Sequence, residues 1–167
     1  MPLHSYARCW LHIVWATIER RPLLPKPAAA KLSAHLHDYA KAKGIYMKIN
    51  FVNADHTHVL IDLPASKAID DVVQLLKGES SHWLNEGNLV SGKFGWQRGY
   101  GAFSVSHSGV DEVCAYIANQ EDHHRKKTFA EELKQLVERY GLAWHEEKTV
   151  ETVFSSTSPS HPAEAGC

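Results

Sequence analysis

The sequence lacks the features that mark secreted and membrane proteins. It holds only three cysteines in 167 residues, an odd number spaced too widely for a disulfide framework or a cysteine-based zinc site. No run of about 18 apolar residues is present, which excludes a transmembrane helix. The N-terminal stretch, interrupted by His4, Arg8 and His12, does not resemble a signal peptide. We therefore expect a cytoplasmic protein with no membrane partner.

An excess of charge of one sign is also missing. The chain carries 18 Lys and Arg against 19 Asp and Glu, a net charge of −1, whereas a pI above about 9 is the usual mark of a nucleic-acid-binding domain. Any DNA-binding surface must therefore be local. The densest basic run offers Arg125, Lys126 and Lys127 as phosphate contacts; the alternative is a solvated helix end whose charges suit the helix dipole. Histidine, by contrast, is abundant, with 12 copies.

The order of hydrophobic patterns predicts an α+β protein. Alternating or β-branched segments indicate strands at 7–18, 45–53, 56–63 and 100–106, with a short strand at 93–97. Helical spacing and capping residues indicate helices at 25–44, 66–85, 108–127 and 128–141, with a glycine-rich loop at 86–99. The order β-α-β-β-α-β is ferredoxin-like: a four-stranded antiparallel sheet with helices on one face, here followed by C-terminal helices. We expect one domain over residues 1–150 and a disordered, Ser/Pro/Ala-rich tail over 151–167.

Two histidines form the first candidate site. His56 and His58 flank one residue of a predicted strand, so their side chains point to the same side with backbones about 6.5–7 Å apart. They can converge on one metal ion; the alternative is a pair of half-exposed histidines with ordinary hydrogen bonds. His12 points away from Leu11 and Ile13 on the first strand, and either reaches the same face as this pair or is an ordinary strand histidine.

A tyrosine and a glutamine form the second candidate. Tyr116 and Gln120 are four residues apart, which places them on one face of a helix. A phenol can act as a covalent nucleophile, but its pKa near 10 calls for help, most simply from a metal. Gln120 would offer its carbonyl oxygen as a third ligand to Mg²⁺ or Mn²⁺. The alternative for Tyr116 is a half-buried tyrosine that packs on the sheet. His123 is close enough in sequence to approach the metal, but we do not count it as a ligand.

Four segments in order carry a family resemblance: DHTHVLIDLP (55–64), VVQLLKGESSHWL (72–84), GYGAFSVS (99–106) and YIANQEDHH (116–124). Together they resemble the insertion-sequence single-tyrosine transposases of the HUH superfamily, including the repeat-hairpin-associated type. The resemblance implies that His56, His58 and Gln120 bind a divalent metal, Mg²⁺ or Mn²⁺, and that Tyr116 attacks single-stranded DNA. The product would be a 5′-phosphotyrosine link and a free 3′-OH, and rejoining would reverse the step. It also implies recognition of DNA hairpins at element ends and a homodimer, in which the tyrosine helix serves either its own subunit or the other.

Two other functions stay open. A catalytically silent, domesticated ferredoxin-like module would bind hairpins by stacking and phosphate contacts alone. A His-x-His metallohydrolase would use metal-bound water in place of Tyr116. For base stacking, Trp96 in the glycine-rich loop is the better candidate, because Trp83 lies on the apolar face of its predicted helix.

Overall fold

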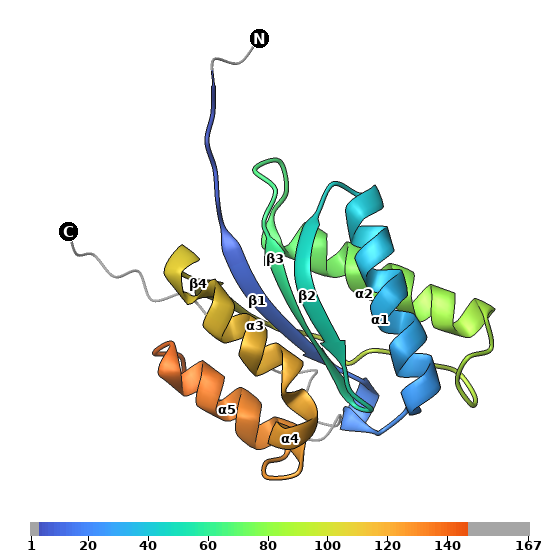
Figure 1. The fold of residues 1–167 in the computed structure, drawn as a ribbon. Coiled ribbons are helices and arrows are strands. Elements are labelled where there is room, and N and C mark those ends of the chain that lie inside the picture. Colours follow the sequence, from blue (N-terminus) through green and yellow to red (C-terminus); the bar gives the residue numbers. More distant parts are fainter. Residues whose placement is uncertain (1–3, 147–167) are drawn as a thin grey trace, which may run out of the picture.

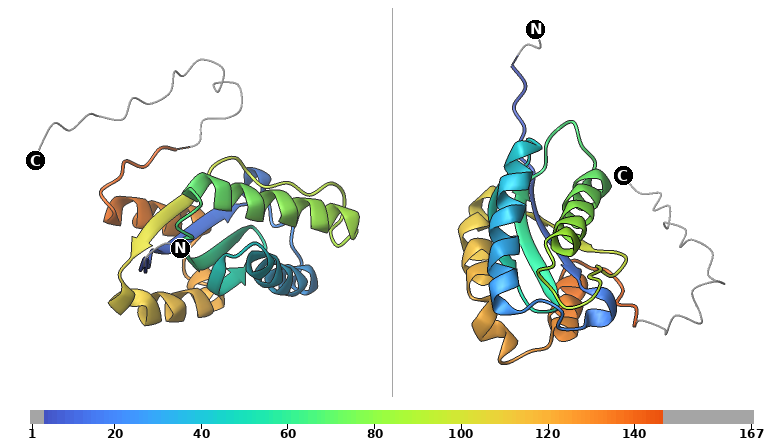
Figure 2. Two further views of the ribbon diagram at one scale, coloured as in Figure 1. Left: turned by 90° about the horizontal axis from the view of Figure 1, so that it is seen from above. Right: turned by 90° about the vertical axis from the view of Figure 1, so that its right-hand side faces the viewer.

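The computed structural model describes residues 4–146, and these form a sheet between two layers of helices (Figures 1 and 2). The sheet is antiparallel, with strand order β2-β3-β1-β4. The strands are β1 (Trp10–Ala16), β2 (Tyr46–Val52), β3 (His56–Asp62) and β4 (Gly101–Val105). The helices are α1 (Lys26–Ala42), α2 (Ile69–Glu86), α3 (Val110–Ala118), α4 (Gln120–His124) and α5 (Phe129–Arg139), with short 3-10 turns at Ile18–Arg20 and His107–Gly109. The predicted ferredoxin-like α+β order is confirmed.

One face of the sheet packs on α1 and α2 through the main hydrophobic core. Alternation along β1 and β3 directs Ile13, Val59 and Ile61 to this side, and Ile13 pairs directly with Val59. Their partners from the helices include Leu36 and Leu76. All five side chains are fully buried, so this face supplies much of the apolar burial that stabilises the domain.

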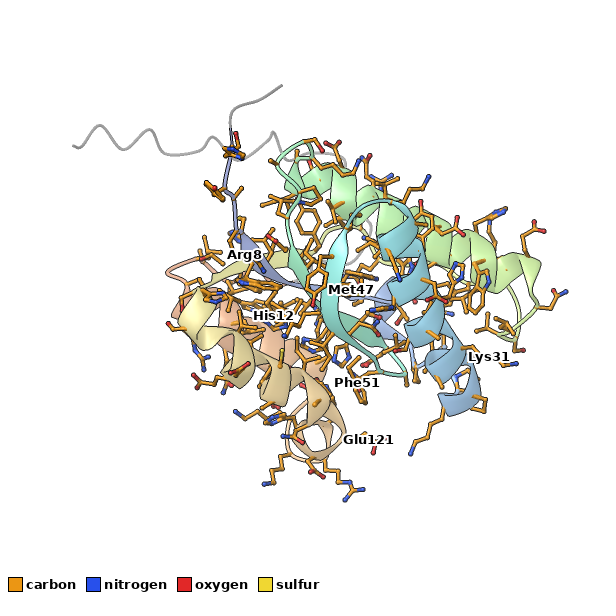
Figure 3. All side chains as sticks on the ribbon, turned by 45° about the horizontal axis from the view of Figure 1, so that its top comes forward. Arg8, His12, Lys31, Met47, Phe51 and Glu121 are labelled. Atoms are coloured by element: carbon orange, nitrogen blue, oxygen red, sulfur yellow. The ribbon has the colours of Figure 1, made fainter. Side chains whose placement is uncertain are left out.

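The opposite face is covered as well, by the C-terminal helices, for which the sequence predicted no face. Ile117 of α3 packs with Leu60 in one apolar cluster, and Phe129 and Leu136 of α5 pack with Phe103 in another. Figure 3 shows His12 and Phe51 on this α3 side of the sheet. The reason is that α3 and α5 each carry an apolar stripe that must be buried, and the second sheet face is the surface that remains.

Several predicted helix ends shift. The helix expected over 108–127 breaks at Asn119, where α3 ends and α4 begins. The capping box expected at Ser108 is absent, because residues 107–109 form a 3-10 turn and Gly109 precedes α3 with no side-chain cap. Helix α2 begins at Ile69, because the backbone N–H of Ala68, and not a Ser66 cap, bonds Asp71.

Other local predictions are confirmed or reduced. Thr128 caps α5 by accepting from the Glu131 N–H, and Gly141 (φ +73°) follows its end. The short strand expected at 93–97 is a single bridge between Trp96 and Thr17. The predicted tail over 151–167 lies outside the described residues. Across residues 4–146, the helices are all too short or too polar to cross a bilayer.

Candidate active site

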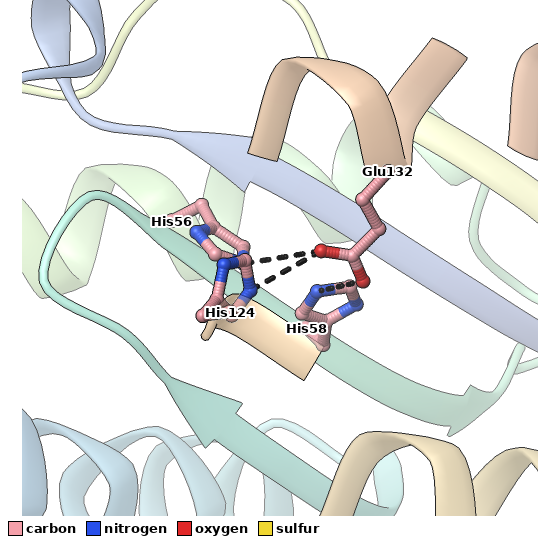
Figure 4. Close-up of side chains that lie close together, drawn as sticks. All are labelled: His56, His58, His124 and Glu132. Atoms are coloured by element: carbon pink, nitrogen blue, oxygen red, sulfur yellow. Dashed lines mark ion pairs between the residues drawn. The ribbon is translucent and has the colours of Figure 1, made fainter. Parts of the chain in front are cut away.

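Four side chains from three elements meet on the covered face of the sheet (Figure 4). His56 and His58 come from β3, His124 from α4 and Glu132 from α5, and one donor atom from each lies within 4.8 Å of all the others. The two β3 histidines are fully buried. The alternative of half-exposed histidines is therefore wrong, and the reason is that α4 and α5 cover this face.

His56 is oriented by the residue before it. Its Nδ1 lies 2.6 Å from a carboxylate oxygen of Asp55, and its Nε2 faces the cluster, where it contacts the Asn53 amide at 3.0 Å. A carboxylate on one ring nitrogen fixes the tautomer that leaves the other nitrogen as a metal donor. Burial lowers the pKa of His56 to about 4, even though Asp55 acts in the opposite direction. The imidazole is thus neutral at physiological pH, as a metal ligand must be.

His58 is oriented by His12. His58 Nδ1 lies 2.8 Å from His12 Nε2, and the two rings stack with centroids 5.1 Å apart. Burial, with a further effect of His58, lowers the pKa of His12 to about 3. His12 therefore lies on the same face as His56 and His58, as a neutral partner of His58. It is not an ordinary strand histidine. The remaining nitrogen of His58, Nε2, is buried and makes no hydrogen bond.

Tyr116 points from α3 toward the same cluster. Its phenol donates a hydrogen bond to Glu132 Oε1, and its ring lies 6.0 Å from that of His58. Burial, together with the neighbouring Glu132 carboxylate, holds the pKa of Tyr116 well above its ordinary value. The phenol is therefore protonated in this arrangement, and the carboxylate holds its proton.

Gln120 joins the tyrosine to the histidines across the break at Asn119. Its Nε2 donates to Glu132 Oε1 at 3.1 Å, and its Oε1 lies 2.9 Å from His124 Nε2. The side chain is fully buried. The predicted ligand set of His56, His58 and Gln120 is thus brought together with Tyr116, and the role of each residue stays a prediction.

Two members of the cluster were not predicted. His124, and not His123, reaches the β3 histidines; the His123 ring instead lies 4.9 Å from that of Tyr116. Glu132 shares a helix face with the buried Phe129 and Leu136. An acidic residue on the apolar face of a predicted amphipathic helix indicates a candidate site residue, because a buried carboxylate needs a partner.

The electrostatics favour a bound cation. Burial alone would raise the pKa of Glu132, but contacts with His124, His58 and Tyr116 hold it well below its ordinary value. Glu132 Oε2 is nevertheless buried without a hydrogen bond, like His58 Nε2. Orphaned buried donor atoms of this kind need a physical explanation, and a divalent metal fits two imidazole nitrogens and a carboxylate.

The predicted DNA contacts divide into two places. Arg125, Lys126 and Lys127 line a cavity of about 1070 Å³ that also reaches His124. Trp96 lies away from the site, where its ring packs edge-on against Trp15, a member of the main core on the α1/α2 face, and its Nε1 donates to Ser80. Base stacking by Trp96 stays a prediction.

Comparison with known proteins identifies the family. The model of the IS200-like transposases matches residues 5–120. The ISDra2 transposase TnpA of Deinococcus radiodurans is 30% identical over 118 residues, which cover 66% of this chain and 83% of that protein. A crystal structure of a transposase from Deinococcus radiodurans superposes with a TM-score of 0.57 at 25% identity, over 72% of this chain and 96% of the other.

A more distant structure shares the fold. It is a REP-associated tyrosine transposase bound to a REP hairpin, with a TM-score of 0.55 and 13% identity over 74% of each chain. The family match and the Deinococcus relative confirm the resemblance drawn from the sequence. The chain belongs to the IS200-like family of single-tyrosine transposases.

Proposed function

We propose that this protein nicks and rejoins single-stranded DNA through a covalent 5′-phosphotyrosine link at Tyr116, with the help of a divalent metal. One observation carries the proposal. The phenol of Tyr116 and the side chains of His58 and His124 meet at the same carboxylate, Glu132. A nucleophile and a set of metal donors at one point are what phosphoryl transfer requires.

His56, His58 and Gln120 would hold the metal, which is Mg²⁺ or Mn²⁺ in the prediction from sequence. When bound, such an ion polarises a phosphate oxygen and neutralises developing charge. His56 and His58 have the orientation for this task, because Asp55 and His12 occupy their outward nitrogens. Neither ring needs to turn to bind an ion, but the amide that contacts His56 Nε2 must move aside.

The chain's own residues would carry the bond changes. The Tyr116 oxygen attacks the phosphorus, the bond to the 3′ oxygen breaks, and the phenolic proton is transferred overall to that 3′ oxygen, so that the products are a 5′-phosphotyrosine and a free 3′-OH. Attack by a 3′-OH on the phosphotyrosine restores a phosphodiester and frees Tyr116. Because the phosphotyrosine keeps the bond energy, no nucleotide cofactor is needed. Glu132 holds the phenolic hydrogen and keeps the oxygen in place.

Two cavities flank the site and give the DNA its approach. One of about 410 Å³ is lined by Tyr116, His12, Glu132 and Arg139, and a phosphate there would face the nucleophile beside a cation. The larger cavity is lined by the basic run 125–127 and by His124 of the cluster. Guanidinium and ammonium groups that contact phosphates supply most sequence-independent affinity for DNA. We propose that the strand enters through these cavities, with Arg125, Lys126 and Lys127 as contacts.

Hairpin DNA is the proposed substrate form, and a homodimer the proposed assembly. The hairpin-bound neighbour shares the fold, which makes hairpin-bearing strands the first to test. One chain contains every residue of the cluster, from His56 to Glu132, so exchange of the tyrosine helix between subunits is not required to assemble the site. Trp96 remains a candidate for base stacking on a separate surface.

A covalent-adduct assay tests this function. Purified protein with MnCl₂ or MgCl₂ would be mixed with labelled single strands that tile the DNA flanking its gene, and resolved on a denaturing gel. We expect a protein-linked band only with a label on the 3′ side of the cut. Tyr116→Phe and His56→Ala should abolish the band, because they remove the nucleophile and a metal ligand, while DNA binding by Tyr116→Phe stays within about twofold.

Tyr46→Phe is the matched control, because Tyr46 is exposed at the sheet edge and its loss should leave the adduct unchanged. Cleavage that survives Tyr116→Phe would establish the metallohydrolase instead. Hairpin binding with no adduct on any strand would establish the silent binding module.

A further inference from the structure

We infer that Glu132 and His124 are metal ligands alongside the β3 histidines, so that the C-terminal helices complete a centre of three imidazoles and one carboxylate. The inference rests on the proposed function in one respect: His56 and His58 must bind a metal. It adds two ligands to those of the proposed function, and it states which class of metal the complete ligand set prefers.

The unpaired atoms carry the argument. Glu132 Oε1 is occupied by the Tyr116 phenol and the Gln120 amide, whereas Oε2 is buried and has no hydrogen bond. His58 Nε2 is likewise buried and unbonded. Leaving buried polar atoms without a hydrogen bond is costly, and a cation bound between the carboxylate and the imidazole would satisfy both atoms at once.

The spacing of the donors matches the coordination sphere of one ion. Two ligands at about 2.0–2.2 Å from a metal lie about 2.8–3.1 Å apart at octahedral angles and about 3.3–3.6 Å apart at tetrahedral angles. Glu132 Oε2 lies 3.2 Å from His124 Nε2 and 3.8 Å from His56 Nε2, and Glu132 Oε1 lies 3.2 Å from His58 Nε2. The distances between these donor atoms therefore need to change by only a few tenths of an ångström for all of them to bind one ion.

Gln120 borders the same point. Its Oε1 lies 2.9 Å from His124 Nε2, again the distance between neighbouring ligands. Gln120, which the sequence predicts as a ligand, thus lies next to both His124 and Glu132. A six-coordinate ion held by these four side chains and Gln120 keeps one site open, which is enough for a phosphate oxygen.

The donor set selects the metal. Imidazole nitrogens suit transition ions, whereas Mg²⁺ prefers carboxylate, carbonyl and water oxygens. Three histidines and one carboxylate therefore favour Mn²⁺, and more strongly still Co²⁺ or Zn²⁺, over Mg²⁺. Of the two ions predicted from sequence, the structure points to Mn²⁺.

The test is direct metal binding by the full-length, metal-stripped protein. Titration calorimetry with MnCl₂ and with MgCl₂ measures affinity without DNA or activity. We expect Mn²⁺ to bind at least tenfold more tightly than Mg²⁺. Substituting a residue that only supports a metal ligand typically lowers metal affinity by about 10–100-fold. Glu132→Gln removes a ligand itself and should therefore lower Mn²⁺ affinity by about 100-fold or more. His124→Asn should lower it by a similar factor.

Glu131→Gln is the matched control, since it removes the neighbouring charge of α5 on an exposed side chain and keeps a capping amide. It should bind Mn²⁺ as the parent does. Glu132→Asp keeps a carboxylate and should recover part of the affinity, which separates lost ligation from a folding defect. Circular dichroism of each variant without metal completes the comparison.

The outcomes separate the two proposals. Glu132→Gln with Mn²⁺ affinity within threefold of the parent overturns this inference, and so does equal affinity of the parent for the two ions. If His56→Ala also binds normally, the metal centre of the proposed function fails as well. If His56→Ala abolishes binding while Glu132→Gln does not, only the ligand role of Glu132 fails.

Discussion

The two faces of the sheet are built from the same strands but differ in chemistry. On the α1/α2 face, alternate residues of β1 and β3 are apolar, with Ile13 and Ile61 fully buried. On the α3–α5 face, the intervening positions carry His12, His56 and His58, also buried. Period-two alternation thus lets one pair of strands hold a hydrophobic core on one side and a buried cluster of titratable side chains on the other.

The difference has an energetic meaning. Apolar burial on the first face involves no titratable group, so its contribution to stability depends on neither pH nor metal. Burial of imidazoles and a carboxylate on the second face is costly unless each finds a partner. Here the partners are other members of the cluster, such as the His12–His58 pair. The stability of the second face should therefore depend on pH and metal, and that of the first should not.

The largest expected effect on stability comes from the apolar face. Ile61→Ala removes a fully buried side chain of the main core, so the free energy of unfolding should fall by about 2–5 kcal/mol. Urea denaturation, with and without MnCl₂, measures the loss. The loss should be equal in both conditions, because Ile61 points away from the site.

Ile61→Val supplies the graded control and should cost about 0.5–1.5 kcal/mol. Mn²⁺ affinity should be unchanged in both variants at temperatures where they are folded. A drop in affinity as large as that expected for Glu132→Gln would show that the two faces behave as one unit.

The sequence predicts the first face better than the second. Strand alternation at 56–63 and the helix patterns of α1 and α2 identify the core, because local period and burial agree there. The coverage of the other face was not predictable in the same way. It depends on how α3 and α5 return over the sheet, which is a matter of tertiary packing and not of local period.

The same division applies to the site. Spacing within a predicted strand identifies His56 and His58, and spacing within a predicted helix identifies Tyr116 and Gln120. The family resemblance points to the same four residues. Glu132 could not be placed this way, because it reaches the β3 histidines across more than 70 residues of chain. The break at Asn119 also turns α4 so that His124, and not His123, faces the cluster.

The next effect is pH dependence of the second face. His12 and His56 have pKa values lowered to about 3 and about 4, from 6.5 in the unfolded chain. Below pH 6.5 the unfolded chain therefore binds more protons, so stability is full above pH 6.5 and falls as the pH drops toward 4. Since one pKa unit corresponds to about 1.4 kcal/mol, each histidine should contribute a metal-free loss of about 2 kcal/mol between pH 7 and pH 5, and the two together a loss on the order of 4 kcal/mol.

Urea denaturation at several pH values between 7 and 5 tests this, in a window above the range where carboxylates titrate. His12→Gln should flatten the profile, because it removes one of the two buried imidazoles. His37→Gln is the control, since His37 is exposed on α1 and should leave the slope as it is. A parent profile that is flat from pH 7 to pH 5 would contradict the assignment of neutral, buried histidines.

The smallest effect sharpens the comparison at the helix that carries Glu132. Thr128→Ala removes the oxygen that accepts from the Glu131 N–H and begins α5, at a cost of about 1 kcal/mol. Because Glu132 lies in this first turn, its loosening should also weaken Mn²⁺ binding by a few-fold, which calorimetry would detect. Thr128→Ser keeps the cap and should restore both quantities. If Thr128→Ala lowers stability but leaves Mn²⁺ affinity unchanged, the proposed metal site does not depend on the cap that begins α5, and the expected coupling between the α5 cap and Mn²⁺ binding is contradicted.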